Sequence, residues 1–183
     1  FPFLCGGRGV VYKRQGGDNF VFGRGGEEVI ACRDAGLSVD VVPGVTSAIA
    51  VPALAGIPVT HRTSSQGFTV VSGHVAPGDP RSDLDWAALA RTRTTLVVLM
   101  GVAHLRAIAS ALVDGGLPAS TPAATIADGA MPSERRVVAT LATLPDAVAD
   151  AGLGAPANTV IGDVVAALDL SLIHISEPTR LRR

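Results

Sequence analysis

The stretch TTLVVLMGVAHLRAIASALV (residues 94–113) decides the fold class, because it joins two different patterns without a break. Residues 94–100 form a continuous apolar run rich in β-branched residues, which by length and composition is typical of a buried strand. Residues 102–113 have apolar positions at helical spacing, and Gly115-Gly116 ends that pattern. The sequence therefore predicts a strand followed at once by a helix, which is the basic unit of an α/β fold.

The same alternation extends in both directions from this stretch. We expect further strands at residues 37–42, 68–72, 123–126 and 135–143, with a last strand beginning at Thr159, and helices at 27–35, 48–55, 86–90 and 144–151. Gly36 is placed to end the first helix, and Thr46 or Ser47 can cap the second. Strands that alternate with helices favour a largely parallel or mixed sheet.

Composition limits the kind of protein this can be. The chain has 183 residues, 48% hydrophobic and 17% charged, with a formal net charge of −1. Disorder requires the opposite balance, and a nucleic-acid binder that works through bulk charge requires a basic face. Prolines and glycines interrupt the most apolar stretch, residues 39–59, so we expect no membrane span. The scattered histidines and two cysteines predict no metal site, and the cysteine usage favours a cytoplasmic location.

Two stretches carry candidate ligand-binding chemistry, the first being GGDNFVFGRGGEE (residues 16–28). Its glycines permit positive φ and let a ligand approach the backbone, although their spacing matches neither the P-loop nor the dinucleotide fingerprint. Arg24 lies between glycines with no packing role and could clamp a carboxylate, while Glu27 could equally be a helix-start charge. Taken by itself, this stretch fits an ordinary surface loop as well as a ligand site.

The second stretch is VVPGVTSAIAVPALAGIPVTHR (residues 41–62). A strand end, a Pro-Gly turn and a hydroxyl at a helix start are typical of the ligand crevice of α/β sheets, and Thr46 could serve as a cap, a ligand contact or both. The polar residues Thr60-His61-Arg62 directly follow the apolar helix. Met100-Gly101 ends the buried strand, where methionine is most often core filler.

Together with VLMG (residues 98–101) and PANTVIGDVV (residues 156–165), these stretches resemble the tetrapyrrole methylase family over residues 16–168. The resemblance implies an α/β fold of two lobes, each a mixed sheet flanked by helices, with S-adenosylmethionine bound in the cleft between them. It implies S-adenosylmethionine-dependent C-methylation of uroporphyrinogen III to precorrin-2, in siroheme- or cobalamin-type tetrapyrrole biosynthesis. It further implies a homodimer in the intact enzyme.

The resemblance also assigns site residues, motif by motif. The residues that it places around S-adenosylmethionine are Gly16, Gly17, Asp18, Val21, Thr46, Ser47, Met100, Gly129 and Ala157. The catalytic set that it places toward the tetrapyrrole is Arg24, Glu27 and Arg62. Arginines suit a substrate that carries eight carboxylates, even in a protein of near-neutral charge. Asn19 stands where the family usually has proline.

The two ends of the chain differ in amino-acid composition from the middle. Residues 1–15 hold the single lysine and tyrosine, Lys13 and Tyr12, and we interpret residues 1–15 and 171–183 as non-native segments. The family's first strand and loop, which include a proposed acidic proton acceptor and a lysine proton donor, have no match before Gly16. We therefore expect an N-terminally truncated fragment with impaired activity, divided into an N-terminal lobe remainder (16–62), a linker (63–66) and a C-terminal lobe (67–170).

Two other functions stay open at this point. One is another precorrin methyltransferase of the same fold, which should share the Met-Gly strand but lack the combination of FGRGGEE and THR. The other is a non-catalytic α/β ligand-binding module.

Overall fold

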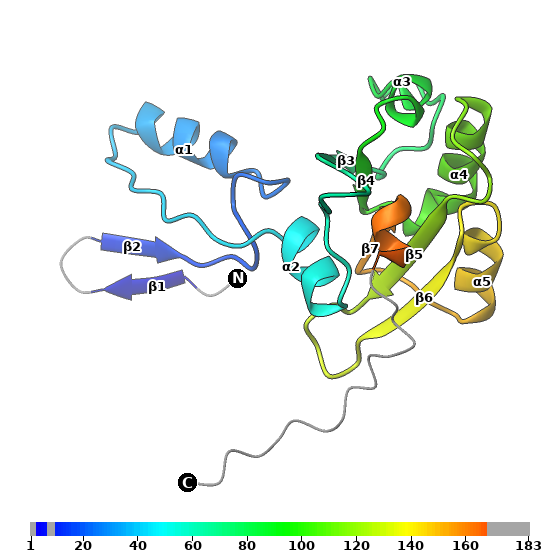
Figure 1. The fold of residues 1–183 in the computed structure, drawn as a ribbon. Coiled ribbons are helices and arrows are strands. Elements are labelled where there is room, and N and C mark those ends of the chain that lie inside the picture. Colours follow the sequence, from blue (N-terminus) through cyan, green and yellow to red (C-terminus); the bar gives the residue numbers. More distant parts are fainter. Residues whose placement is uncertain (1–2, 7–9, 168–183) are drawn as a thin grey trace, which may run out of the picture. The chain divides into compact units, whose positions relative to one another are not determined.

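The computed structural model describes residues 3–6 and 10–167, and the chain divides into two units between Ser47 and Ala48 (Figure 1). The division lies before the linker predicted at residues 63–66 because helix α2 (Ser47–Leu54) and Ile57 pack with the C-terminal unit. Val51 and Ile57 share a buried cluster with Ile126 and Val160. The boundary at residues 63–66 between the two lobes stays a prediction.

The described residues of the N-terminal unit form one hairpin and one helix. Strands β1 (Phe3–Gly6) and β2 (Val10–Lys13) pair antiparallel, and Val11 and Tyr12 are largely exposed. Helix α1 (Gly25–Asp34) confirms the helix predicted at 27–35. Gly36 (φ +74°) ends it as expected, because Gly36 N donates to Arg33 O at 2.9 Å and Leu37 N to Cys32 O at 3.0 Å.

The prediction of a strand at residues 37–42 is wrong. These residues have no strand structure, and the side chain of Val42 is 83% exposed. A strand exists only through the partner that accepts and donates its backbone hydrogen bonds, and no described strand pairs with this segment. Residues 16–62 therefore contain helices but no strand within the described part of the chain.

The C-terminal unit is built on a mixed sheet of five strands in the order β3-β4-β7-β5-β6. The strands are β3 (Phe68–Ser72), β4 (Thr95–Leu99), β5 (Pro122–Ala127), β6 (Arg135–Thr140) and β7 (Ala157–Ile161). Only the β3–β4 pair is parallel; β7 runs antiparallel to both of its neighbours, β4 and β5. The predicted α/β class is confirmed, and each predicted strand of this unit lies within about two residues of its expected start.

Helices cover both faces of this sheet, as Figure 1 shows. The helical elements that follow β3 are α3 (Trp86–Ala90), η1 (Val102–His104), α4 (Leu105–Asp114), α5 (Leu144–Asp150) and η2 (Asp163–Ala166). Leu96 and Val98 of β4 are buried in the cluster that contains α3, α4 and α5, whereas Val97 packs on the opposite face with Ala48 of α2. This alternation follows from the period-two geometry of a strand buried on both faces.

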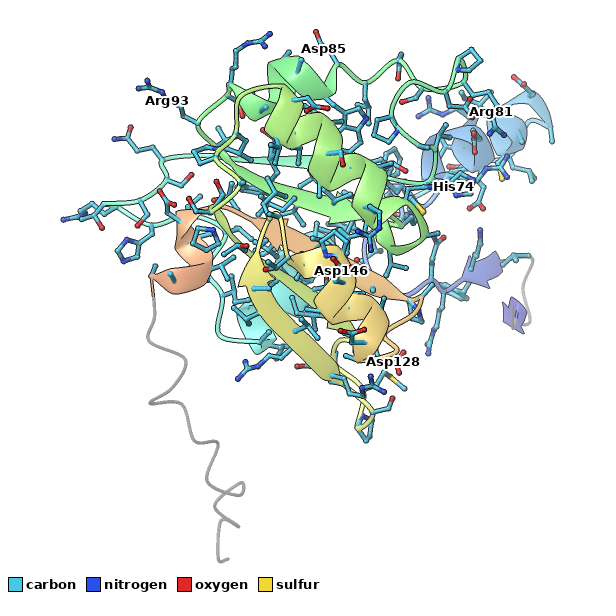
Figure 2. All side chains as sticks on the ribbon, turned by 90° about the vertical axis from the view of Figure 1, so that its right-hand side faces the viewer. His74, Arg81, Asp85, Arg93, Asp128 and Asp146 are labelled. Carbon is cyan, nitrogen blue, oxygen red and sulfur yellow. The ribbon has the colours of Figure 1, made fainter. Side chains whose placement is uncertain are left out.

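Polar side-chain contacts stabilise the ends of α3 and α5. Asp85 (labelled in Figure 2) caps α3 by accepting a hydrogen bond from Ala88 N at 2.8 Å. Asp146, also labelled there, lies in the first turn of α5 and pairs with Arg106 of α4. The Arg106 guanidinium lowers the pKa of the Asp146 carboxyl from its ordinary value. No helix in the described part of the chain is long and apolar enough to cross a membrane.

Candidate functional site

The glycine-rich stretch folds into a loop that closes on Asn19. Gly25 N donates to Asn19 O at 2.8 Å, and a Cβ atom at Gly23 or Gly25 would lie 2.7 or 2.6 Å from that same oxygen. Only glycine fits such close backbone approaches. Phe22 and Arg24 both have positive φ, at 55° and 60°, and residues of these types rarely adopt that conformation. The loop that leads into α1 is therefore strained and closely packed, unlike an ordinary surface connection.

Asp18 joins the two candidate stretches, although 26 residues separate them in sequence. Its Oδ1 accepts from Phe20 N at 2.8 Å, within its own loop, and its Oδ2 accepts from Gly44 N at 2.9 Å, in the Pro-Gly turn. A Cβ atom at Gly44 would lie 2.1 Å from Gly17 O, so the two backbones touch at their glycines. The chain thus brings together the Gly-Gly-Asp turn and the turn before α2.

The other predicted cofactor contacts in this unit lie around that junction. Gly17 has a φ of +78°, and a side chain there would face Val45 O at 3.8 Å and Ser47 N at 4.0 Å. Gly16 has open space around it, which leaves its backbone accessible to a ligand. Thr46 and Ser47 follow the Pro-Gly turn directly, and Ser47 is the first residue of α2. Val21 N donates to Asp18 O at 3.3 Å, which keeps Val21 in the same loop.

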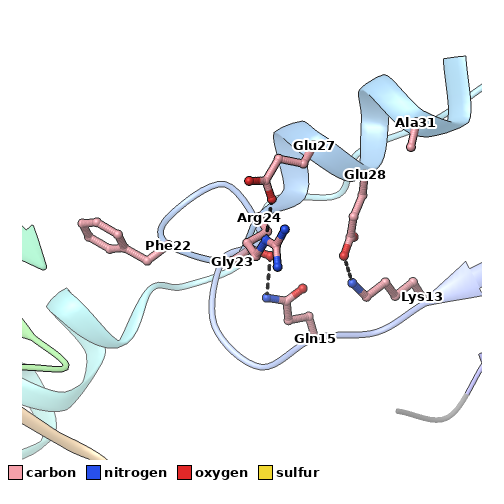
Figure 3. A pocket seen from close by; sticks show the side chains of 8 residues that line it. All are labelled: Lys13, Gln15, Phe22, Gly23, Arg24, Glu27, Glu28 and Ala31. Carbon is pink, nitrogen blue, oxygen red and sulfur yellow. Dashed lines mark hydrogen bonds and ion pairs between the residues drawn. The ribbon is translucent and has the colours of Figure 1, made fainter. Parts of the chain in front are cut away.

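Arg24 and Glu27 form an exposed ion pair at the start of α1 (Figure 3). Arg24 Nε donates to Glu27 Oε2 at 2.6 Å, with the two side chains 80% and 63% exposed. This hydrogen bond raises the pKa of the Arg24 guanidinium above its ordinary value. The pair borders a hollow of about 560 Å³, whose lining residues are Lys13, Gln15, Phe22, Gly23, Arg24, Glu27, Glu28 and Ala31. The two catalytic candidates of this unit therefore lie side by side on one surface.

In the C-terminal unit, Met100 leaves the end of β4 in a strained conformation. Its φ is +57° and its side chain is 47% exposed, so it is not the core filler that a methionine after a buried strand most often is. A Cβ at Gly73, which follows β3, would lie 2.6 Å from Gly101 Cα. The ends of the two parallel strands thus approach as closely as glycine permits, and Met100 lies beside this junction.

Gly129 and Ala157 reach the same edge of the sheet as Met100. Ala157 begins β7 opposite Ala127, the last residue of β5, and Asn158 pairs with Leu99, the last residue of β4. Gly129 follows β5 two residues later, and a Cβ there would lie 2.4 Å from Val51 Cγ1 of α2. The three predicted cofactor contacts of this unit, taken from segments far apart in sequence, therefore share one edge.

Arg62 does not share that edge. It lies in a turn over residues 61–65 whose last residue, Ser65, accepts a hydrogen bond from Thr95 N at 3.1 Å. Thr95 is the first residue of β4 and Met100 follows the last, so the turn is anchored one strand length, roughly 16 Å, from Met100. The structure thus separates Arg62 from the other predicted contacts of its unit.

Sequence reasoning missed two features of this edge. Asp128 and Ala130 flank Gly129 with positive φ of 52° and 69°, which makes the whole turn after β5 strained. Gly73, at the close approach to Gly101, was not among the predicted site residues. The sequence did contain a signal for this close approach, because Gly73 and Gly101 each directly follow a predicted apolar strand. Among the described residues, no group of three His, Cys, Asp or Glu side chains is placed to hold a metal ion.

Comparisons with known proteins agree on the family and the fold. The family model described as tetrapyrrole (corrin/porphyrin) methylases matches residues 5–145, a range that begins before Gly16, where the resemblance of the motifs starts. The interpretation of residues 1–15 as non-native stays a prediction, and residues 171–183 lie outside the described part of the chain.

Individual relatives are similar over most of this chain. A siroheme synthase from Chromobacterium violaceum is 45% identical over 87% of this chain and 33% of its own length. An S-adenosyl-L-methionine-dependent uroporphyrinogen III methyltransferase from Methanosarcina barkeri is 46% identical over 85% of this chain and 61% of its own. The crystal structure of uroporphyrin-III C-methyl transferase from Thermus thermophilus complexed with S-adenyl homocysteine matches with a TM-score of 0.70 and 40% identity, over 82% of this chain and 62% of that one. The chain thus spans between a third and three fifths of these relatives.

Proposed function

Because the chain belongs to the tetrapyrrole methylase family, we propose that it is an S-adenosylmethionine-dependent methyltransferase that converts uroporphyrinogen III to precorrin-2. Relatives named for uroporphyrinogen III methylation and for siroheme synthesis support this substrate and pathway. The neighbouring crystal structure with S-adenyl homocysteine supports the methyl donor.

The observation that carries the proposal is the junction that Asp18 makes between the Gly-Gly-Asp turn and the Pro-Gly turn. A carboxylate that accepts two backbone N–H groups fixes two loops in one arrangement, and Gly17 and Gly44 let the backbones meet. A preformed, glycine-lined surface of this kind suits a ligand that is recognised mainly through backbone groups. In this proposal Gly16, Gly17, Asp18, Val21, Thr46 and Ser47 bind the cofactor from the N-terminal unit.

Met100, Gly129 and Ala157 contribute the cofactor contacts of the C-terminal unit in this proposal. Backbone strain of the kind seen at Met100 persists only where the surroundings enforce it, and it concentrates at ligand sites. When bound, S-adenosylmethionine supplies a methyl group on a positively charged sulfur. The residues around it orient that group toward a pyrrole carbon and exclude water, which accounts for most of what such a transfer requires of a protein.

Arg24, Glu27 and Arg62 form the tetrapyrrole side. The Arg24–Glu27 contact is the same charge-assisted bond that Arg24 would make with a substrate carboxylate, and its exposure leaves it free to exchange partners. Glu27 would then lie next to the bound substrate, from whose methylated ring a proton must leave. Transfer forms a carbon–carbon bond at the pyrrole, breaks the sulfur–methyl bond and releases this proton.

The test is methyl transfer measured together with cofactor binding. Titration calorimetry of this chain with S-adenosylhomocysteine should show one saturable site. Anaerobic incubation with labelled S-adenosylmethionine and uroporphyrinogen III should give labelled precorrin-2, identified by mass, at a lower rate than the Methanosarcina barkeri relative used as the positive control, because we expect impaired activity. A folded chain that binds no S-adenosylhomocysteine would contradict the proposal. Labelling of a different precorrin would instead assign the chain to another reaction of the family.

A homodimer of the intact enzyme and a cytoplasmic location complete this proposal. The first comes from the family resemblance and the second from the cysteine usage. Sedimentation equilibrium of the intact enzyme tests the first, because a sedimenting mass equal to one chain at all concentrations would contradict it.

A further inference from the structure

Residues 61–65 form a narrow turn that is fixed at its base. His61 N donates to Ser65 O and Ser65 N donates to His61 O, both at 2.9 Å, which closes an isolated antiparallel bridge. Ser65 is buried, and its Oγ donates to Gly67 O at 2.7 Å while accepting from Thr95 N at 3.1 Å. The first two of these bonds close the turn on itself, and the bond from Thr95 N attaches it to the start of β4.

The imidazole of His61 holds the turn together from one side. Its Nδ1 lies 3.4 Å from Thr63 N, 3.0 Å from Thr63 Oγ1 and 3.5 Å from Ser64 Oγ. A backbone N–H can only donate, so Nδ1 is the acceptor of the bond from Thr63 N. This geometry matches the turn in which an Asn or Asp side chain accepts from the backbone N–H two residues on.

The turn presents one side chain that it does not use. Arg62 is exposed, and within the described part of the chain no residue forms an ion pair or hydrogen bond with its guanidinium. By contrast, Arg24, Arg81 and Arg106 each pair with a carboxylate of the chain. A guanidinium on a rigid backbone loses less conformational freedom when it binds a carboxylate than one on a mobile loop.

We propose that His61 is a positioning residue, whose Nδ1 holds the turn that aims Arg62 at a carboxylate of the tetrapyrrole. The proposal rests on the proposed function, because it takes the tetrapyrrole as the anion that Arg62 meets. The inference goes beyond the proposed function by giving His61 a role, and by specifying that this role needs only a hydrogen-bond acceptor at the Nδ1 position.

That last point permits a rescue experiment. Asparagine places an oxygen acceptor where Nδ1 stands, whereas leucine fills a similar volume with no acceptor. The probe is uroporphyrin III, the stable oxidised form of the substrate, with binding followed by its fluorescence. We expect Arg62→Ala to weaken binding roughly tenfold, the loss of about one charge-assisted contact. His61→Leu should weaken it severalfold, and His61→Asn should restore affinity to within about twofold of the parent.

Controls separate positioning from general damage. His61→Leu should have no further effect in the Arg62→Ala background, because the two residues act as one unit. Affinity for S-adenosylhomocysteine should be unchanged in each variant, and Arg91→Ala, which removes another exposed arginine, should leave uroporphyrin binding intact. Full additivity of the two substitutions, or failure of asparagine to rescue, would overturn the proposal.

The outcome for Arg62→Ala distinguishes this inference from the function itself. If that variant binds uroporphyrin III as the parent does, His61 has nothing to position and the inference is wrong. Methyl transfer and S-adenosylhomocysteine binding would still support the proposed activity in that case. If the parent chain binds neither ligand, the proposed function is wrong as well.

Discussion

Replacing Asp18 with asparagine tests whether the junction between the two loops holds the cofactor surface. The carboxylate accepts from Phe20 N at 2.8 Å and from Gly44 N at 2.9 Å. The asparagine side chain offers a single oxygen, so one of the two N–H groups would face the amide NH₂, which cannot accept. A hydrogen bond to a charged group contributes about 1.5–3 kcal/mol, and the exposed position of these bonds favours the lower end.

Loss of about 1.5 kcal/mol from the closed arrangement lowers affinity by at most roughly tenfold, because about 1.4 kcal/mol corresponds to one factor of ten. We therefore expect Asp18→Asn to raise the dissociation constant for S-adenosylhomocysteine by up to roughly tenfold, measured by titration calorimetry. Asp40→Asn is the matched control, since it removes an equal charge from an exposed position in the same unit.

Gly44→Ala breaks the same junction without touching the carboxylate. The new Cβ would lie 2.1 Å from Gly17 O, so the two turns must separate by about 1 Å or more to reach ordinary contact distance. It should weaken S-adenosylhomocysteine binding at least as much as Asp18→Asn does. If neither substitution changes the affinity, the junction does not form the cofactor site. If only Asp18→Asn acts, the carboxylate binds the ligand directly and the loop contact is unimportant.

Three further predictions concern other parts of the chain. Gly129→Ala should lower the midpoint of thermal unfolding, because the new Cβ would lie 2.4 Å from Val51 Cγ1. Adding Val51→Ala should recover part of that loss, since this second substitution removes the two methyl groups nearest the new Cβ. In the full-length parent enzyme, Arg24→Ala should reduce methyl transfer far more than it lowers the unfolding midpoint, because exposed ion pairs contribute little to stability. Equal turnover of variant and parent would remove Arg24 from the site. The Arg81 guanidinium lowers the pKa of Asp79 to about 2. Their pairing should therefore stabilise the fold at pH values above the ordinary carboxyl pKa of 3.8, and this stabilisation should be lost as the pH falls through about 2. Titration of the Asp79 carboxyl by NMR should find this low midpoint, and Arg81→Ala should return the midpoint toward 3.8.

The candidate site could be predicted from sequence only as a set of motifs. The resemblance named Gly17, Asp18 and Met100, but no pattern in the chain indicates that the Asp18 carboxylate bonds the N–H of Gly44. Spacing along the chain carries no information about which two turns meet, because that depends on how the backbone returns. The same limit explains Arg62, whose turn is anchored at the end of β4 remote from Met100.

Periodicity and local chemistry were sufficient for most of the elements. The run at residues 95–99 is a strand buried on both faces, the helix at 105–114 follows it, and Gly36 ends α1, because each depends on side chains within a few residues. The strand predicted at residues 37–42 is the exception, because a strand also needs a partner strand that is distant in the sequence. Its apolar residues meet the local requirement, yet no described strand pairs with it.

Tertiary structure alone decided how those elements combine. The sequence specifies five strands in this unit but not that β7, the last of them, inserts antiparallel between β4 and β5. That insertion places Ala157 beside the end of β5 and brings Gly129 and Met100 to one edge. Pairing order and register arise from contacts between residues distant in the chain, whose geometry local propensity does not encode. The candidate cofactor contacts were therefore predictable from the sequence, whereas the meeting of Met100, Gly129 and Ala157 at one edge was decided by the fold.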